Sequence, residues 1–305
     1  SCFEAYVDTN GYSTTGAVTG TSEVRAYSIA VDTKYTAYAY AGVSAPTGGV
    51  SADIGVYEFN VNIGVAIVTT SALAGIMGGG IVGSSTAQDI LVTATGDTHA
   101  EAEVQTPTIE VSGVSVAANV IIAILRSSQL ALAEDVTIEQ AKSLSVISNL
   151  NVLDNSSDPG AYAGLGGTGE AESGVSINLM SASASVAIAT NDARGIARTE
   201  NITLGTSASP ASLTVRSIGR SYAKAEIIQP SGVGLITLTV NVLYAYANGV
   251  FESLAGFADG GSYLNNLTVE TVYEAYSEAY TGSGVLSLTV ASIATNVAYA
   301  ETGTI

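Results

Sequence analysis

A degenerate internal repeat constrains the fold of this chain more than any other feature of its sequence. A glycine-valine pair recurs five times, at intervals of roughly 50 to 65 residues, which is long for a structural repeat. The five sites are Gly48-Gly49-Val50, Ser112-Gly113-Val114, Ser173-Gly174-Val175, Ser231-Gly232-Val233 and Ser283-Gly284-Val285. Such a repeat predicts one array of stacked units rather than several independent globular domains.

Two further landmarks recur in the units in a constant order. The first is a leucine-containing element: Leu91-Val92-Thr93, Leu144-Ser145-Val146, Leu213-Thr214-Val215 and Leu267-Thr268-Val269. The second is an alanine pair: Ala37-Tyr38-Ala39, Ala100-Glu101-Ala102, Ala161-Tyr162-Ala163 and Ala223-Lys224-Ala225, with a looser version at Ala275 and Ala279. We therefore divide the single array 1–305 into units 49–112, 113–173, 174–231 and 232–283, flanked by partial units 1–48 and 284–305.

Within the units the hydrophobic pattern has a period of two, which indicates β-strands. Large apolar residues alternate with small or polar ones over 57–67 and again over 236–247. One face carries Tyr57, Phe59, Val61, Ile63, Val65 and Ile67, and the corresponding later face carries Ile236, Leu238, Val240, Val242, Tyr244 and Tyr246. The pattern predicts strands of about 11 residues, twice the usual length. Residues 130–143 are the one segment whose spacing also allows a helix.

These observations predict an all-β fold: a repetitive, long-stranded, β-solenoid-like array of about five degenerate units. Neither end resembles a polar cap, because the chain stops in mid-unit at Ile305 and opens near Phe3 in what resembles the middle of a unit. Three lysines and five prolines are few for protecting open strand edges. We therefore expect the end of one subunit to continue its sheet into the next, giving a homopolymer. The alternative is a closed or monomeric fold whose last strands cover the ends.

Composition excludes several function classes. The net charge is -18, from 27 acidic and nine basic residues, so the chain has no basic surface for nucleic acid. A hydrophobic content of 47% argues against disorder. No apolar run reaches the ~20 residues of a membrane helix, so we predict no transmembrane segment. The first residue, Ser1, is not methionine, which we interpret as a processed chain that is compatible with export.

Resemblances to two groups of surface proteins follow from these residues. The unit, with its glycine-valine, Leu-x-Val and Ala-x-Ala elements, resembles the repeats of large secreted bacterial filamentous adhesins that form β-solenoids. The acidic, Ala/Gly/Ser-rich and sheet-forming character, with a cysteine near one end, is similar to the subunits of the tubular sheath of methanogenic archaea, which build stacked β-sheet hoops. Both resemblances imply an extracellular structural protein, and the second implies hoops held by continuous sheets and by covalent cross-links.

Candidate sites for chemistry are few. Cys2 has no internal partner, so a disulfide could join it only to another chain. Asn155, Asn201 and Asn266 begin matches to the N-glycosylation acceptor. His99 with Glu101 and Glu103, and the turn at Asp154, Asn155 and Asp158, like Asp259 beside Gly260, are better explained as surface polar groups than as metal ligands. We predict no catalytic residue, metal or cofactor.

The sequence therefore predicts a structural subunit of an extracellular sheath, filament or cell-envelope lattice, whose partner is itself. Its mechanism would be β-strand addition between identical chains. The alternative is an adhesin whose exposed threonine-rich faces, such as Thr237 and Thr239, bind a glycan or a cell surface. An enzyme is not expected, because no cleft of paired carboxylates or nucleophilic triad is indicated.

Overall fold

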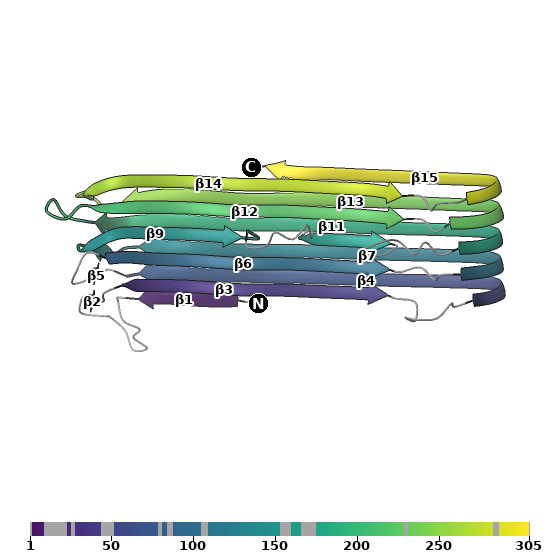
Figure 1. Ribbon diagram of the computed structural model, residues 1–305, viewed down its shortest axis with the longest axis horizontal. Coiled ribbons are helices and arrows are strands. Elements are labelled where there is room, and N and C mark those ends of the chain that lie inside the picture. The colour runs from purple at the N-terminus through teal and green to yellow at the C-terminus, as the bar shows by residue number, and fades with distance from the viewer. Residues whose placement is uncertain are drawn as a thin grey trace.

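The computed structural model describes residues 2–8, 23–25, 28–43, 52–78, 81–83, 88–104, 109–152, 160–165, 175–228, 231–282 and 287–304. Every named element in these residues is a β-strand, and every pair of named strands is parallel. Successive windings of the chain lie one above another in a flat stack (Figure 1). The predicted all-β, repetitive, solenoid-like fold is thereby confirmed.

The longer of the two main sheets, here the long-stranded sheet, contains one strand from each winding. Its order is β1 (Cys2–Asp8), β4 (Ala52–Met77), β7 (Ile109–Glu134), β11 (Val175–Leu204), β13 (Ser231–Phe257) and β15 (Ser287–Thr304). β4 has 26 residues and β11 has 30, more than twice the length predicted from the alternating runs. The runs were underestimated because small residues such as alanine continue the strands beyond the large apolar ones.

The second main sheet, here the short-stranded sheet, is formed by the return path of each winding. Its strands are β3 (Ile29–Val43), β6 (Gln88–Val104), β9 (Ala141–Leu150), β10 (Ala161–Leu165), β12 (Ala211–Ile228) and β14 (Leu264–Gly282). β9 and β10 share one level, because both pair with β6 on one side and with β12 on the other. The two sheets face each other across the core.

At one end of the stack a strip of short strands joins the two sheets. It contains β2 (Glu23–Arg25), β5 (Ile81–Gly83) and β8 (Thr137–Ile138), with β8 pairing to the end of β11. The chain enters this strip through residues with positive φ: Gly78 at 110°, Asp135 at 51° and Asn201 at 51°. Asparagine, aspartate and glycine tolerate this left-handed conformation best, so the corner recurs at these residues.

This corner overturns the helical interpretation of residues 130–143. The segment contains the end of β7, the turn at Asp135, β8 and the start of β9. Parallel pairing of its strands with the neighbouring windings outweighs the local helix-like spacing, since Ala133 and Ile138 are buried between the sheets. Asp135 was the signal for a corner, and its side chain accepts a hydrogen bond from Asn201 Nδ2 at 2.6 Å.

At the opposite end each long strand bends through an arc toward the short-stranded sheet (Figure 1). The bend occurs where the pairing skips one residue: Asn178 pairs with Ser112 and Met180 pairs with Val114, leaving Leu179 outside the ladder. The same skip separates Gly234 from Ile236. Gly113 therefore lies at the bend of β7, whereas Val175 and Gly232 lie at the starts of β11 and β13. Gly49 and Gly284 fall outside the described residues.

The core between the sheets has two apolar clusters. One lies toward the strip and contains large aliphatic side chains such as Ile76, Ile138 and Leu144. The other is dominated by alanines that pair across successive windings, such as Ala100 with Ala161 and Ala161 with Ala223. Alanine side chains allow the sheets to approach closely here, and the predicted alanine pair is therefore a packing element.

Strand register refines two of the predicted repeat landmarks. Leu144, Leu213 and Leu267 occupy one row, but their partner in β6 is Ile90 rather than Leu91. Similarly, Ala100 pairs with Ala39, so the counterpart of the alanine pair in β3 is Ala39-Tyr40-Ala41 and not Ala37-Tyr38-Ala39. Both assignments were displaced because neighbouring residues of the same type fit the repeat equally well in sequence.

Truncation of a core leucine should separate packing from surface contributions. Leu144 is fully buried, whereas Leu91, on the neighbouring strand, is 39% exposed on the outer face. We expect Leu144→Ala to lower the free energy of unfolding by about 2–5 kcal/mol and Leu91→Ala to lower it by less than about 1 kcal/mol. Urea unfolding followed by circular dichroism measures both. Equal losses would contradict the assignment of these faces.

Candidate assembly edges and outer faces

In the part of the chain that the structure describes, strand edges are open at both ends of the stack. Among the described residues, β3 pairs only with β6 and β14 pairs only with β12. In the long-stranded sheet, β1 covers Ser71–Met77 of β4, and residues 52–70 of β4 pair with β7 alone. At the other end, β15 covers β13 from Gly232 to Gly249, and residues 250–257 pair with β11 alone. Open parallel edges present backbone donors and acceptors to a further strand.

The uncovered parts of the two ends correspond to each other in register. Following the pairing across the sheet, Gly249 of β13 corresponds to Ala193, then to Ser127, and then to Thr70 of β4. Residues 232–249 of β13, which β15 covers, therefore correspond in register to the open part of β4. Residues 71–77 of β4, which β1 covers, correspond to the open residues at the end of β13. A strand shaped like β15 fits the first open edge, and one shaped like β1 fits the second.

A row of amide side chains lies on the inner side of the long-stranded sheet near the arc. Asn62 Nδ2 donates to Asn119 Oδ1 at 2.9 Å, and Asn119 Nδ2 donates to Ser185 Oγ at 3.2 Å. In the last two windings, Asn241 Nδ2 donates to Asn296 Oδ1 at 2.8 Å. All three bonds have the same direction along the stack. They fix the register of the strands, because a slip by one residue would place the amides on the outer face.

The outer face of the short-stranded sheet is polar and aromatic. Arg216 Nε lies 2.8 Å from Glu270 Oε2 and Arg220 Nε lies 2.9 Å from Glu274 Oε2, each across neighbouring strands. Tyr222 stacks on Tyr276 with ring centroids 5.0 Å apart. This face is therefore stabilised by cross-strand ion pairs and ring stacking, and it is suited to contact with water.

Tyrosines on this face sit beside carboxylates. Burial raises the pKa of Tyr222 to about 12, and the charge of Glu278 contributes to the rise. Burial likewise raises the pKa of Tyr162, with the charge of Glu226 beside it, to which the Tyr162 hydroxyl donates at 3.3 Å. Both hydroxyls are therefore neutral hydrogen-bond donors over the physiological pH range.

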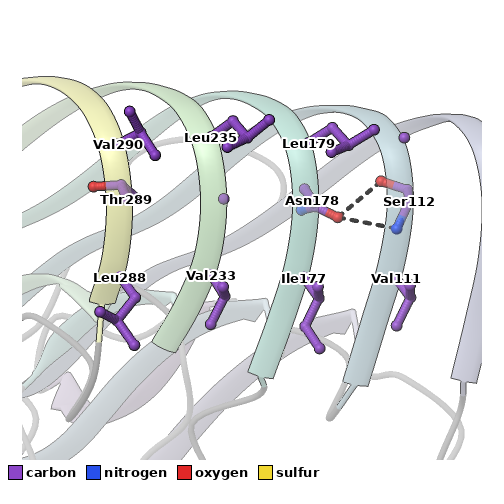
Figure 2. A pocket seen from close by; sticks show the side chains of 12 residues that line it. Val111, Ser112, Ile177, Asn178, Leu179, Val233, Leu235, Leu288, Thr289 and Val290 are labelled. Atoms are coloured by element: carbon purple, nitrogen blue, oxygen red, sulfur yellow. Dashed lines mark hydrogen bonds between the residues drawn. The ribbon is translucent and has the colours of Figure 1, made fainter.

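The outer face of the long-stranded sheet has the opposite character. In the half nearer the arc its outward side chains are mostly aliphatic or aromatic, and Phe59 and Val61 are 73% and 72% exposed. Where this face meets the arc, two rows of aliphatic side chains flank a hollow of about 620 Å³ that crosses four windings. Figure 2 shows Ile177 and Val233 in one row and Leu179 and Leu235 in the other, with Asn178 between the rows and hydrogen-bonded to Ser112.

The candidate cross-link residue Cys2 lies on β1. It is exposed, it pairs with Ser71 in the ladder, and its thiol lies 3.3 Å from a carboxylate oxygen of Glu4.

The candidate metal-binding histidine, His99, stacks on Tyr38 with ring centroids 5.1 Å apart, and its Nε2 lies 3.5 Å from Glu101 Oε2. Within the described ranges no group of three or more histidine, cysteine or carboxylate side chains could hold a metal ion.

The three candidate glycosylation sites differ in setting. Asn266 is exposed on β14, at an open edge of the stack. Asn201 is exposed at the corner, but its amide nitrogen bonds Asp135. Asn155 lies outside the described residues, as do Asp154 and Asp158. Asp259 is exposed in the turn that contains Gly260 and Gly261.

The threonines expected to form an exposed binding face lie elsewhere. Thr237 and Thr239 are on the same face of β13 as the buried Asn241 and Leu243, and Thr239 Oγ1 accepts a hydrogen bond from Ser183. Alternate residues of a strand point to opposite sides, and the large apolar residues of β13 point outward. The two threonines therefore point into the stack. Alternation in the sequence separated the two faces correctly, but it gave no sign of which face was internal.

Comparison with known proteins adds no assignment, since no family model, no curated protein and no solved structure matches the chain. The described part of the chain contains no helix long and apolar enough to cross a membrane.

Stability should fall at alkaline pH. A tyrosine whose folded pKa is raised contributes fully below its unfolded pKa of 10.0, and the contribution is lost as pH rises through its folded value. For Tyr222 the window is therefore pH 10 to about 12. The urea midpoint of unfolding should decrease as pH rises from 9 to 12. In Tyr222→Phe the midpoint should decrease less steeply with pH. An unchanged slope in this variant would contradict the link to Tyr222.

Proposed function

We propose that this chain is a structural subunit that assembles end to end by β-strand addition into an extracellular sheath, filament or envelope lattice. The observation that carries the proposal is the correspondence between the open edges of the two ends. A second copy stacked on the first would place its β4 against β15 and its β1 against residues 250–257 of β13. Such a contact is heterologous and head-to-tail, so it gives a ring if its rotation closes and a filament if it does not.

The inner amide row supports the same arrangement. Asn296 accepts from Asn241 through its Oδ1, so its Nδ2 is able to donate to a further level, while Asn62 donates to Asn119 through its Nδ2, so its Oδ1 is able to accept. In the register of the sheet, Asn296 of one copy would lie beside Asn62 of the next. A donor would therefore meet an acceptor, and the direction of donation within the subunit would continue across the junction.

The short-stranded sheet would also continue. Pairing across this sheet places Tyr276 in the row of Tyr222, His99 and Tyr38, so Tyr276 would stack on Tyr38 of the next copy. The same register places Glu270 in the row of Asp32, where two carboxylates would face each other across the junction. This repulsion, together with the net charge of -18, predicts that added salt promotes assembly by screening.

The position of Cys2 limits how it could cross-link the polymer. Consecutive copies would repeat every five levels of the long-stranded sheet, so their Cys2 residues would be about 24 Å apart, from about 4.8 Å per level. A disulfide needs Cα atoms within about 7 Å. In this arrangement Cys2 could form a disulfide only with a laterally adjacent copy or with another protein.

The first test is negative-stain electron microscopy of the purified chain, with sizing at several concentrations. We expect filaments, hoops or tubes whose length increases with protein concentration and with salt. A monodisperse monomer at every concentration and ionic strength would overturn the proposed function.

A single substitution should weaken the junction while leaving the subunit folded. Asn296→Asp keeps the oxygen that accepts from Asn241 but loses the donor, so a carboxylate would face Asn62 Oδ1 of the next copy. An unsatisfied buried group costs about 1–3 kcal/mol, so the critical concentration for assembly should rise roughly tenfold to hundredfold.

The matched control for this substitution is Ser145→Asp. It adds the same charge to the outer face of β9, which is paired on both sides. We expect its critical concentration to stay within about threefold of wild type, since the surface charge is remote from the junction. If both variants assemble equally well, the amide contact across the junction is refuted.

A further inference from the structure

The outer face of the long-stranded sheet is an unusual surface for a protein with so acidic a chain. We define the aliphatic face as the outward side chains of β4, β7, β11, β13 and β15 in six rows between the arc and the middle of the sheet. The rows begin at Tyr57, Phe59, Val61, Ile63, Val65 and Ile67 of β4. On β13 they contain Ile236, Leu238, Val240, Val242, Tyr244 and Tyr246. Most of these large side chains are substantially exposed, including Ile63 at 62% and Ile293 at 66%.

Polarity is inverted in this part of the fold. The same strands direct Asn119, Ser185 and Asn241 inward, where all three are buried. Transfer of the aliphatic side chains from water would be favourable, at roughly 25 cal/mol per Å² of apolar surface. Burial of amides and hydroxyls gives no comparable gain, even when they are hydrogen-bonded. The arrangement is therefore suited to a state in which the aliphatic face is covered.

The aliphatic face has a polar boundary where it ends. The next outward row contains Arg126, Asp192 and Asn248, and Asn248 Nδ2 donates to Asp192 Oδ1 at 3.2 Å. Among the described residues, the outer face of the opposite sheet contains four of the five ion pairs shown by the structure, those of His99, Arg216, Arg220 and Lys224. Near the arc, the apolar and ionic surfaces thus lie on opposite sides of the stack, whereas nearer the strip the outer face of the long-stranded sheet carries charged residues such as Arg198 and Glu200.

The size of the aliphatic face fits a protein partner. Eleven residues at about 3.3 Å and five strands at about 4.8 Å give about 36 Å by 24 Å, or roughly 870 Å². A stable protein interface buries about 800 Å² on each partner. Thr190, Thr295 and Glu301 interrupt its apolar rows, and Glu301 lies at the corner next to the polar boundary. The other side chains of the six rows form one continuous apolar field, unlike a scattered set of exposed apolar residues.

From these observations we infer that the aliphatic face pairs with the same face of a second copy, forming a two-layered wall with ionic surfaces outside. The row Val61, Ala118, Ala184 and Val240 contains the smallest side chains and lies between rows that begin at Phe59 and Ile63. It forms a trough parallel to the stack axis. When two such sheets pack about 10 Å apart, a neighbouring row of one copy can enter the trough of the other.

A lipid surface matches the aliphatic face less well than a second copy does. Proteins that lie on membranes combine an apolar face with lysine, arginine and tryptophan at its border. This chain contains no tryptophan, and the one cation in the boundary row, Arg126, is accompanied there by Asp192. The net charge of -18 also opposes approach to an anionic membrane.

The test compares lysine substitutions on opposite faces. Val186 lies at the centre of the aliphatic face on β11, and Ile147 lies at the outer face of the opposite sheet on β9. Sedimentation velocity of the wild-type chain, below its critical concentration for end-to-end growth, should give twice the monomer mass. Val186→Lys should weaken dimerisation at least a hundredfold and give the monomer mass, with unchanged circular dichroism. Val186→Leu and Ile147→Lys should remain dimeric.

Three results would overturn the inference: a wild-type monomer at concentrations up to the onset of growth, an unchanged dimer in Val186→Lys, or co-sedimentation of the wild-type monomer with uncharged phosphatidylcholine vesicles. The last would identify a lipid surface as the occupant. Pairing through the aliphatic face does not depend on end-to-end assembly, and the two contacts can be disrupted by different substitutions. Asn296→Asp should shorten the polymers while leaving the dimer, whereas Val186→Lys should produce single-layered material whose ends still assemble.

Discussion

Register between parallel strands is the constraint on which the rest of this structure depends. Each winding repeats the previous one closely enough for Asn119 to lie beside Asn62 and for Ala161 to lie beside Ala100. Side chains of one kind therefore gather in rows along the stack. The buried amides determine the alignment, because only one pairing gives each of them a hydrogen-bonding partner inside the stack.

The same constraint gives the molecule two different outer surfaces. Since alternate residues of a strand point to opposite sides, a polar inner row near the arc leaves large apolar residues outside, as for Asn62 beside Val61 and Ile63. On the other sheet the inner positions are occupied by aliphatic residues such as Leu144 and Leu213, and the charged residues lie outside. Near the arc, one repeat thus produces an ionic surface on one side of the stack and an apolar surface on the other.

The sequence predicted the fold class well and the location of the surfaces poorly. Alternation and the repeat were sufficient to predict stacked strands, because both depend on local geometry. Leu91 and Ala37 were assigned to the wrong rows, since register is decided by partners more than 50 residues away. The internal position of Thr237 and Thr239 was not predictable, because it depends on how far the opposing sheet extends. The open edges were anticipated from the few lysines and prolines, while the corner at Asp135 was mistaken for part of a helix.

The division of one level of the short-stranded sheet between β9 and β10 has a mechanical consequence. Backbone hydrogen bonds between windings point along the stack, so a pull in that direction is shared by all the bonds of a level. Among the described residues, β12 pairs with β9 through eight residues and with β10 through five, whereas it pairs with β14 through 18. Of these two ladders, the one to β9 and β10 should therefore open first under tension, with the long-stranded sheet serving as the hinge.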